Sequence, residues 1–147
     1  MDLGNFLSVG NVLLDVQASS KTGLLNDLCA RAATALGFDA KAISHEIQKR
    51  ERLGSTGVGG GVAIPHARIP GLTNAFGMLA RLQKPIDFDA IDGRPVDIVF
   101  LLLLPTAASG EHLNVLAAVA RKLRDSDVLR KIRQSRDSKA LHGAVTA

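Results

Sequence analysis

A chain of 147 residues, 46% apolar and 22% charged, can bury a core as one domain (1–147), and its composition excludes intrinsic disorder. The net charge of +4 is concentrated in residues 121–136, and the absence of Trp and Tyr argues against nucleic acid binding by base stacking. The longest apolar run, 98–105, is too short to span a bilayer, no leader is evident and Cys29 is the single cysteine, so we expect a cytoplasmic protein without a membrane span.

The N-terminal part is predicted to hold a strand and two helices. After a helical or irregular start, residues 12–16 are apolar enough for a strand. A helix begins after the N-cap Ser20, carries apolar residues at helical spacing, and ends at Gly37. Asp39 caps a second helix to about Arg52, which therefore delivers basic side chains at its C-terminal end.

Three further strands are predicted at 61–64, 75–82 and 96–104. The first is expected to stop at Pro65. The third is apolar at nearly every position, as in a central strand covered on both faces. An extended piece at 86–88 lies between the last two strands, among turn residues.

Helices are expected in the remainder of the chain. Ser109 is a suitable N-cap for a helix whose core-facing residues are taken to be Leu113, Leu116, Ala117, Ala120 and Leu123. Shorter helices follow from about 125 and from 138 to 145. The order of elements predicts an α/β fold, a single-domain mixed β-sheet flanked by helices on both faces.

The segment 54–69 has the composition of a phosphate site. It combines two hydroxyls, Ser55 and Thr56, with a glycine run and His66, and basic residues flank it. It matches neither a P-loop nor a dinucleotide fingerprint, because no Lys-Ser or Lys-Thr follows the glycines and they lead out of a helix rather than into one. A flexible turn between a helix and a strand remains the alternative.

Two histidines are candidates for chemistry. His66 follows the end of a strand, where a neutral imidazole can attack phosphorus, although a lone histidine is more often a surface or capping residue. His112 lies in the first turn of a predicted helix, whose dipole favours a phosphoryl group. Arg50 can neutralise charge in phosphoryl transfer. A metal site formed by the two histidines is a weaker alternative, because no nearby Cys or third His completes the set, although Asp and Glu are abundant. His45 and His142 are expected to be exposed.

The motif from Arg50 to His66, RERLGSTGVGGGVAIPH, resembles the active-site segment of phosphotransferase system (PTS) enzyme IIA domains of the mannitol/fructose class. It is most similar to their nitrogen regulatory branch, IIA-Ntr (PtsN). The segment PIDFDAIDGRPVDIVFLLLLP and the pair at 112–113 extend the resemblance over nearly the whole chain. The resemblance implies the mannitol/fructose-type IIA fold and no cofactor.

By this resemblance, His66 is the phosphoryl acceptor, and His112 and Arg50 are the other catalytic residues. Ser55 and Thr56 correspond to the hydroxyl pair near the site, and we add Arg68 as a phosphate-binding residue. The sequence departs from the family at Gly60, where Asn is common, and at 67–68, where Ala-Arg replaces a frequent Gly-Lys. Arg68 keeps the charge but presents a bidentate fork.

The resemblance implies a regulatory phosphocarrier, a phosphotransferase component that accepts phosphate from a HPr/NPr-type protein. Regulated targets in the family include potassium transporters and sensor kinases. Two alternatives stay open: a sugar-specific IIA that passes phosphate to a IIB domain, and a non-catalytic interaction module. The sequence does not decide whether the chain forms a homodimer.

Overall fold

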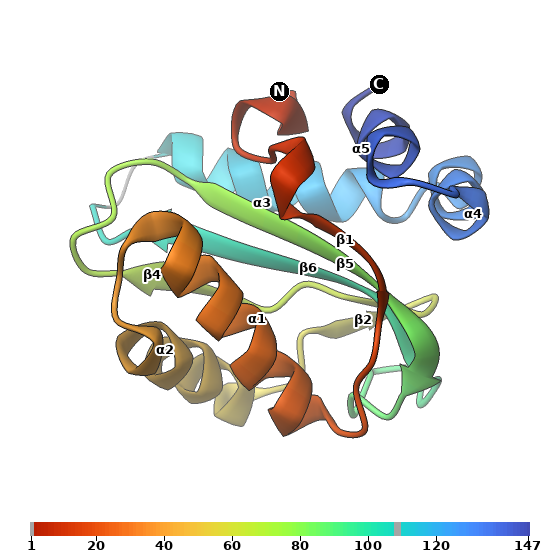
Figure 1. The fold of residues 1–147 in the computed structure, drawn as a ribbon. Coiled ribbons are helices and arrows are strands. Elements are labelled where there is room, and N and C mark those ends of the chain that lie inside the picture. The colour runs from red at the N-terminus through yellow and green to blue at the C-terminus, as the bar shows by residue number, and fades with distance from the viewer. Residues whose placement is uncertain (1, 108–109) are drawn as a thin grey trace.

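The computed structural model describes residues 2–107 and 110–147, and of residues 110–112 only the backbone. Within these residues, six strands form one sheet and five α-helices cover it (Figure 1). In chain order, after two short 3₁₀ helices η1 (Leu3–Asn5) and η2 (Val9–Asn11), the elements are β1 (Val12–Val16), α1 (Lys21–Leu36), α2 (Ala40–Leu53), β2 (Gly57–Gly59), β3 (Val62–Ala63), β4 (His66–Ile69), β5 (Phe76–Ile86), β6 (Val96–Pro105), α3 (Gly110–Lys122), α4 (Ser126–Gln134) and α5 (Ser138–Thr146).

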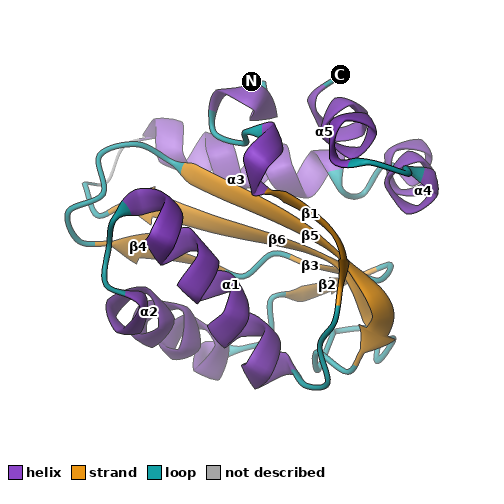
Figure 2. Cartoon of the chain, viewed as in Figure 1, coloured by secondary structure: helices purple, strands orange, loops and turns teal. Residues whose placement is uncertain are grey.

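The sheet is mixed and has a helical layer on each face (Figure 2). Its order is β1-β5-β6-β3-β2, with β4 also paired to β6. Strand β5 is antiparallel to β6 and parallel to β1, whereas β3 and β4 run parallel to β6. The predicted fold class is therefore confirmed.

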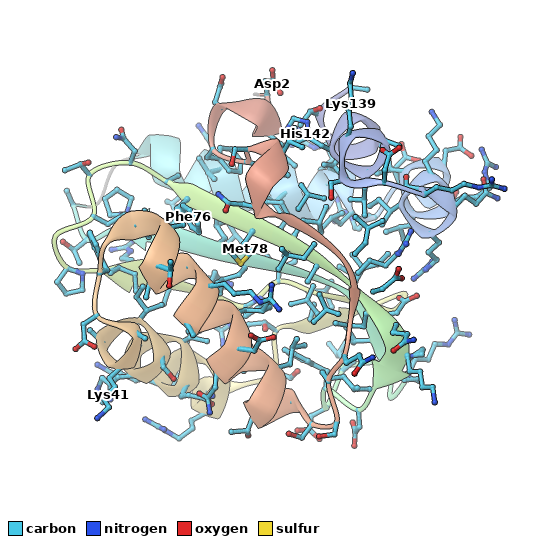
Figure 3. All side chains as sticks on the ribbon, viewed as in Figure 1. Asp2, Lys41, Phe76, Met78, Lys139 and His142 are labelled. Atoms are coloured by element: carbon cyan, nitrogen blue, oxygen red, sulfur yellow. The ribbon has the colours of Figure 1, made fainter. Side chains whose placement is uncertain are left out.

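Strand β6 explains why both faces need cover. Its alternate side chains enter two separate cores: Val99, Leu101 and Leu103 pack with α1 and α2. Ile98, Phe100 and Leu102 pack with α3, α4 and α5 on the opposite face. Met78 of β5, labelled in Figure 3, belongs to the first of these cores. A strand buried on both faces has to be apolar throughout, as its sequence indicated.

The two N-terminal helices form as predicted. The Ser20 hydroxyl accepts a hydrogen bond from the Gly23 N–H at 3.1 Å, and Gly37 ends α1 in the left-handed conformation with φ of 71°. The Asp39 carboxylate accepts from the Lys41 N–H at 3.1 Å at the start of α2. Helix α2 packs beside β4, which brings its C-terminal turn close to His66.

The strand predicted before Pro65 is β3, which ends at Ala63, but the sequence reading missed the strand β4 that begins at His66. The pairing of Val62 with Ile98 and of His66 with Leu102 has the same register, so β3 and β4 are one parallel strand interrupted at residues 64–65. Pro65 has no N–H to donate, but its carbonyl accepts from the Leu102 N–H at 2.9 Å and keeps the pairing in place. His66 therefore follows one strand, as predicted, and also begins the next.

The glycine run forms a β2–β3 hairpin that the sequence reading treated as a loop. Gly59, Gly60 and Gly61 all have positive φ, between 69° and 99°. At Gly61 the φ of 82° favours glycine, and a Cβ there would also lie 2.6 Å from the Arg133 guanidinium, which would have to move. The Gly60 N–H donates to Asp92 at 3.0 Å, which ties the hairpin tip to the loop before β6.

The prediction for the core face of α3 is partly right. Leu123 is buried, and Leu116 and Ala120 pack against the core, but Ala117 is exposed and Leu113 is 63% exposed. The buried residues that the prediction missed are Val115 and Val119.

The expectation for His142 is wrong. His142 on α5 is partly buried rather than exposed, and its Nε2 donates to the Leu7 carbonyl at 2.7 Å; Figure 3 shows it beside the N-terminal segment. Ser109, the proposed N-cap, lies outside the described residues.

Candidate phosphoryl-transfer site

The predicted acceptor His66 opens on a cavity of about 350 Å³ between α2, β4 and α3. Its walls combine basic and apolar side chains from these elements with the end of β6. The lining residues are Glu46, Lys49, Arg50, Leu53, His66, Ala67, Arg68, Leu104, Leu113 and Leu116. A larger hollow of about 530 Å³ lies beside Arg121 and Lys122, but no histidine lines it. We therefore place the candidate site by its chemistry rather than by the size of the cavity.

The ring of His66 is held in one tautomer by the backbone. Its Nδ1 lies 2.8 Å from the Ile64 carbonyl oxygen, which can only accept a hydrogen bond, so Nδ1 carries the proton. Nε2 is then the ring nitrogen that can act as a nucleophile. Burial lowers the pKa of His66 below its ordinary value, the bond to Ile64 raises it, Arg50 lowers it and Glu51 raises it. A neutral imidazole is the form that this balance favours near neutral pH.

Arg50 and Arg68 are brought to the same cavity from different elements. Arg50 is in the last turn of α2, and its Nη1 donates to the Gly54 carbonyl at 2.8 Å, which orients the guanidinium. Its remaining N–H groups leave the fork able to bind an anion. Arg68 is on β4, two residues after His66. The structure thus gathers three of the six predicted site residues, Arg50, His66 and Arg68, around one cavity.

Ser55 and Thr56 are not among the residues that line this cavity. The Ser55 hydroxyl donates to the Phe88 carbonyl at 2.8 Å and accepts from the Gly57 N–H at 3.0 Å. The Thr56 hydroxyl is buried and donates to the Glu51 carboxylate. In this structure both hydroxyls bond to the protein itself, and their predicted contact with phosphate stays a prediction.

His112 lies in the first turn of α3, as predicted, but its side chain is outside the described part of the structure. Leu113 and Leu116 of the same helix line the cavity, so the start of α3 lies at its wall. A contact between His112 and a phosphoryl group on His66 therefore remains an expectation.

The sequence reading missed two features of the site. Glu51 is buried although it is a carboxylate. The sequence could have indicated this burial, because Glu51 lies four residues after Ile47 on the inward face of α2. Leu53 and Leu113 are exposed at the cavity, 83% and 63%, and form an apolar rim. Large apolar side chains exposed together beside a reactive group are typical of a protein-binding surface.

Among the side chains that the structure describes, those of residues 2–107 and 113–147, no three His, Cys, Asp or Glu gather as a metal site. Within residues 2–107 and 110–147, no helix has both the length and the hydropathy to cross a membrane.

Comparison with known proteins identifies what the chain is similar to. Residues 5–146 match the family described as "Phosphoenolpyruvate-dependent sugar phosphotransferase system, EIIA 2". A "Nitrogen regulatory protein" of Bradyrhizobium diazoefficiens is 43% identical over 145 residues, covering 99% of this chain and 95% of the relative.

Solved structures agree with the sequence matches. The crystal structure of nitrogen regulatory protein IIA-Ntr from Neisseria meningitidis matches with a TM-score of 0.93 and 33% identity, covering 98% of this chain and 99% of that one. The mannitol enzyme IIA in a complex with phosphorylated enzyme IIB from Escherichia coli matches with a TM-score of 0.78 at 14% identity. This second match covers 95% of this chain and 96% of that one, and it shows the fold alone.

Proposed function

Since the chain belongs to the EIIA 2 family of the phosphoenolpyruvate-dependent sugar phosphotransferase system, we propose that it is a phosphohistidine carrier of the nitrogen regulatory type. His66 accepts a phosphoryl group from a HPr/NPr-type donor, and the phosphorylation state controls the binding of target proteins. The observation that carries this proposal is the fixed Nδ1–H tautomer of His66 at a cavity lined by Arg50 and Arg68.

The chemistry is a direct transfer between two imidazoles. The lone pair on Nε2 of His66 forms a new P–N bond while the P–N bond of the donor breaks, and the donor nitrogen leaves with that electron pair. Nδ1 of His66 keeps its proton throughout, hydrogen-bonded to Ile64, so no general base is needed. Arg50, with Lys49 and Arg68 on the same cavity wall, offsets the charge of the transferring group.

The apolar rim gives the donor a place to dock. Leu53 and Leu113 stand on two sides of the cavity, on α2 and α3, and both are exposed. A carrier that covers them excludes water from the cavity, which strengthens the interaction of the phosphoryl group with the basic side chains. The same surface would bind regulated targets, so phosphorylation at its centre would change their affinity.

The test is phosphoryl transfer from a phosphorylated HPr- or NPr-type carrier. The wild-type chain is expected to gain one acid-labile phosphate, and His66→Ala none. His45→Ala is the matched control, because His45 is exposed on α2 and does not line the cavity. Acid-labile phosphate retained on His66→Ala would contradict the proposal that His66 is the phosphoryl acceptor.

A sugar-specific role is the second candidate, and the family description, which names a sugar phosphotransferase system, favours it. Such a protein would pass its phosphate to a IIB domain. Adding IIB domains to the phosphorylated chain and following the label separates the two functions, because a regulatory carrier keeps its phosphate. A non-catalytic module would instead bind its partner equally well as wild type and as His66→Ala.

A further inference from the structure

Glu51 is a carboxylate on the buried face of α2. Ile43, Ile47 and Glu51 are four residues apart, and all three are buried. The Glu51 side chain is only 4% exposed. A buried carboxylate is costly unless it is paired and hydrogen-bonded, so its partners have to be accounted for.

Three donors hold this carboxylate. The Thr56 hydroxyl donates to Oε1, the Thr56 N–H donates to Oε2 at 3.2 Å, and the Lys21 ammonium lies 2.9 Å from Oε2. Lys21 is itself fixed, since its Nζ lies 4.6 Å from the centre of the Phe88 ring. Glu51 therefore fixes both the backbone and the side chain of Thr56.

Thr56 is connected to His66 through the backbone of Ile64. Its carbonyl accepts from the Ile64 N–H at 2.9 Å, at the interruption between β3 and β4. The Ile64 carbonyl in turn accepts from Nδ1 of His66 at 2.8 Å. A continuous path of hydrogen bonds thus runs from a buried carboxylate to the ring nitrogen opposite the proposed nucleophile.

We propose that Glu51 is a positioning residue which, through Thr56 and Ile64, fixes the orientation and tautomer of His66. This role rests on the proposed phosphoryl transfer. It gives Thr56 a function in the scaffold, holding the Ile64 carbonyl where Nδ1 needs it, instead of direct contact with phosphate. Lys21 completes the arrangement by neutralising the buried charge.

Charged groups reach His66 from each element around it. Glu46, Lys49 and Arg50 of α2 and Arg68 of β4 line the same cavity, and His112 begins α3. Among the groups that shift the pKa of His66, the negative charge of Glu51 raises it, whereas burial and Arg50 lower it. Removing the charge of Glu51 should therefore lower the pKa of His66 further.

The unphosphorylated protein provides the first test, by ¹⁵N NMR of the His66 ring over a pH titration. In Glu51→Gln we expect a lower titration midpoint and a smaller share of the Nδ1–H tautomer. Thr56→Val should also reduce that share, while Thr56→Ser, which keeps the hydroxyl, should match wild type. Asp27→Asn is the matched charge control, because Asp27 is on α1 and pairs with Arg31. Ring titration and tautomer unchanged in both Glu51→Gln and Thr56→Val would overturn the proposal.

Transfer kinetics provide the second test. Glu51→Gln and Thr56→Val should slow phosphoryl acceptance from the donor between a few-fold and about 100-fold, the range for a misplaced reactive group. If Thr56→Val slows transfer but leaves the ring nitrogens unchanged, Thr56 contacts the phosphoryl group directly and the proposal is wrong.

The two tests separate this proposal from the proposed function. Should wild type accept no phosphate, the carrier function fails, but the ring measurements still decide the role of Glu51. Should Glu51→Gln fail to fold, as judged by its thermal unfolding, the comparison of Thr56→Val with Thr56→Ser decides alone.

Discussion

Leu53 offers the sharpest test of the docking surface, because the chain contains a matched control. Leu53 is 83% exposed and lines the cavity, whereas Ile91 is 85% exposed and does not line it. Both are large aliphatic side chains, so replacing either with Ser removes similar apolar area. Only Leu53→Ser should lower the affinity for the phosphoryl donor.

The magnitude follows from the area that docking could bury. Fully burying a Leu side chain is worth about 1.5–3 kcal/mol, so the exposed 83% of Leu53 could contribute roughly 1.2–2.5 kcal/mol. Since about 1.4 kcal/mol of binding free energy corresponds to a tenfold change in affinity, Leu53→Ser should lower the affinity for the donor roughly 7- to 60-fold if docking covers the side chain completely.

The assay is calorimetric binding of the unphosphorylated donor, with the apparent KM for the phosphorylated donor as a second measurement. Thermal unfolding of both variants should stay close to wild type, since neither side chain is in the core. Equal loss of affinity in Leu53→Ser and Ile91→Ser would refute the reasoning, as would no loss in either.

Three further predictions concern stability and reactivity. Burial lowers the pKa of His66 in the folded protein below its ordinary 6.5, so the unfolded chain binds a proton at His66 more readily. The free energy of unfolding therefore keeps its full value above pH 6.5 and decreases as the pH falls from 6.5 through the lower pKa of the folded protein. On acidification, the free energy of unfolding measured in urea should therefore decrease more for wild type than for His66→Gln. Equal pH dependence in the two proteins would contradict this. Gly57→Ala should cost about 1–3 kcal/mol by denaturant unfolding, because its Cβ would lie 2.8 Å from the Ala90 backbone, whereas Gly10→Ala meets nothing within 4 Å and should be nearly neutral. Burial raises the pKa of Cys29 to about 12, so thiol reagents should label it only after denaturation, and rapid labelling of the native protein would disprove that.

The fold was predictable where local signals decide it. Helices α1 and α2 begin directly after their N-caps, Ser20 and Asp39, which form as the sequence indicated, and Gly37 is the C-cap of α1. The short strands β2 and β4 were missed for different reasons. Strand β2 is a glycine-rich arm of a hairpin with its neighbour β3, so its composition resembles that of a loop, whereas β4 depends on a partner far away in the sequence. Residues 66–69 become a strand only because β6 offers a parallel partner in continuous register.

The face of α3 shows a different limit. Two apolar stripes run along this helix, and the sequence does not say which one meets the core. Val115 and Val119 are buried, while Leu113 and Leu116 line the cavity. Of the stripe predicted for core packing, Leu123 is buried in the core, but the N-terminal part belongs to the candidate site.

The site itself was predictable in its charged residues and less so in its polar scaffold. Arg50, His66 and Arg68 meet at one cavity because α2 packs against β4. Thr56 carries a side chain that suits a phosphate, but a hydroxyl bonds whichever acceptor the fold presents, and here that acceptor is Glu51. Sequence alone identifies the donor group and not its partner.

In the proposed carrier, the cavity that accepts the phosphoryl group is also the part of the surface whose charge determines the binding of target proteins. Three cationic side chains, Lys49, Arg50 and Arg68, and one carboxylate, Glu46, line it. A phosphoryl group on His66 adds about −1.5 to −2 charges, which nearly cancels this cationic excess. A target that docks an apolar face on Leu53 and Leu113 would then meet a hydrated dianion at the centre, and a target with acidic groups would lose its attraction to the rim. In the proposed carrier, phosphorylation would therefore lower the affinity of both kinds of target without needing a change in backbone conformation, because it changes the charge of the docking surface itself.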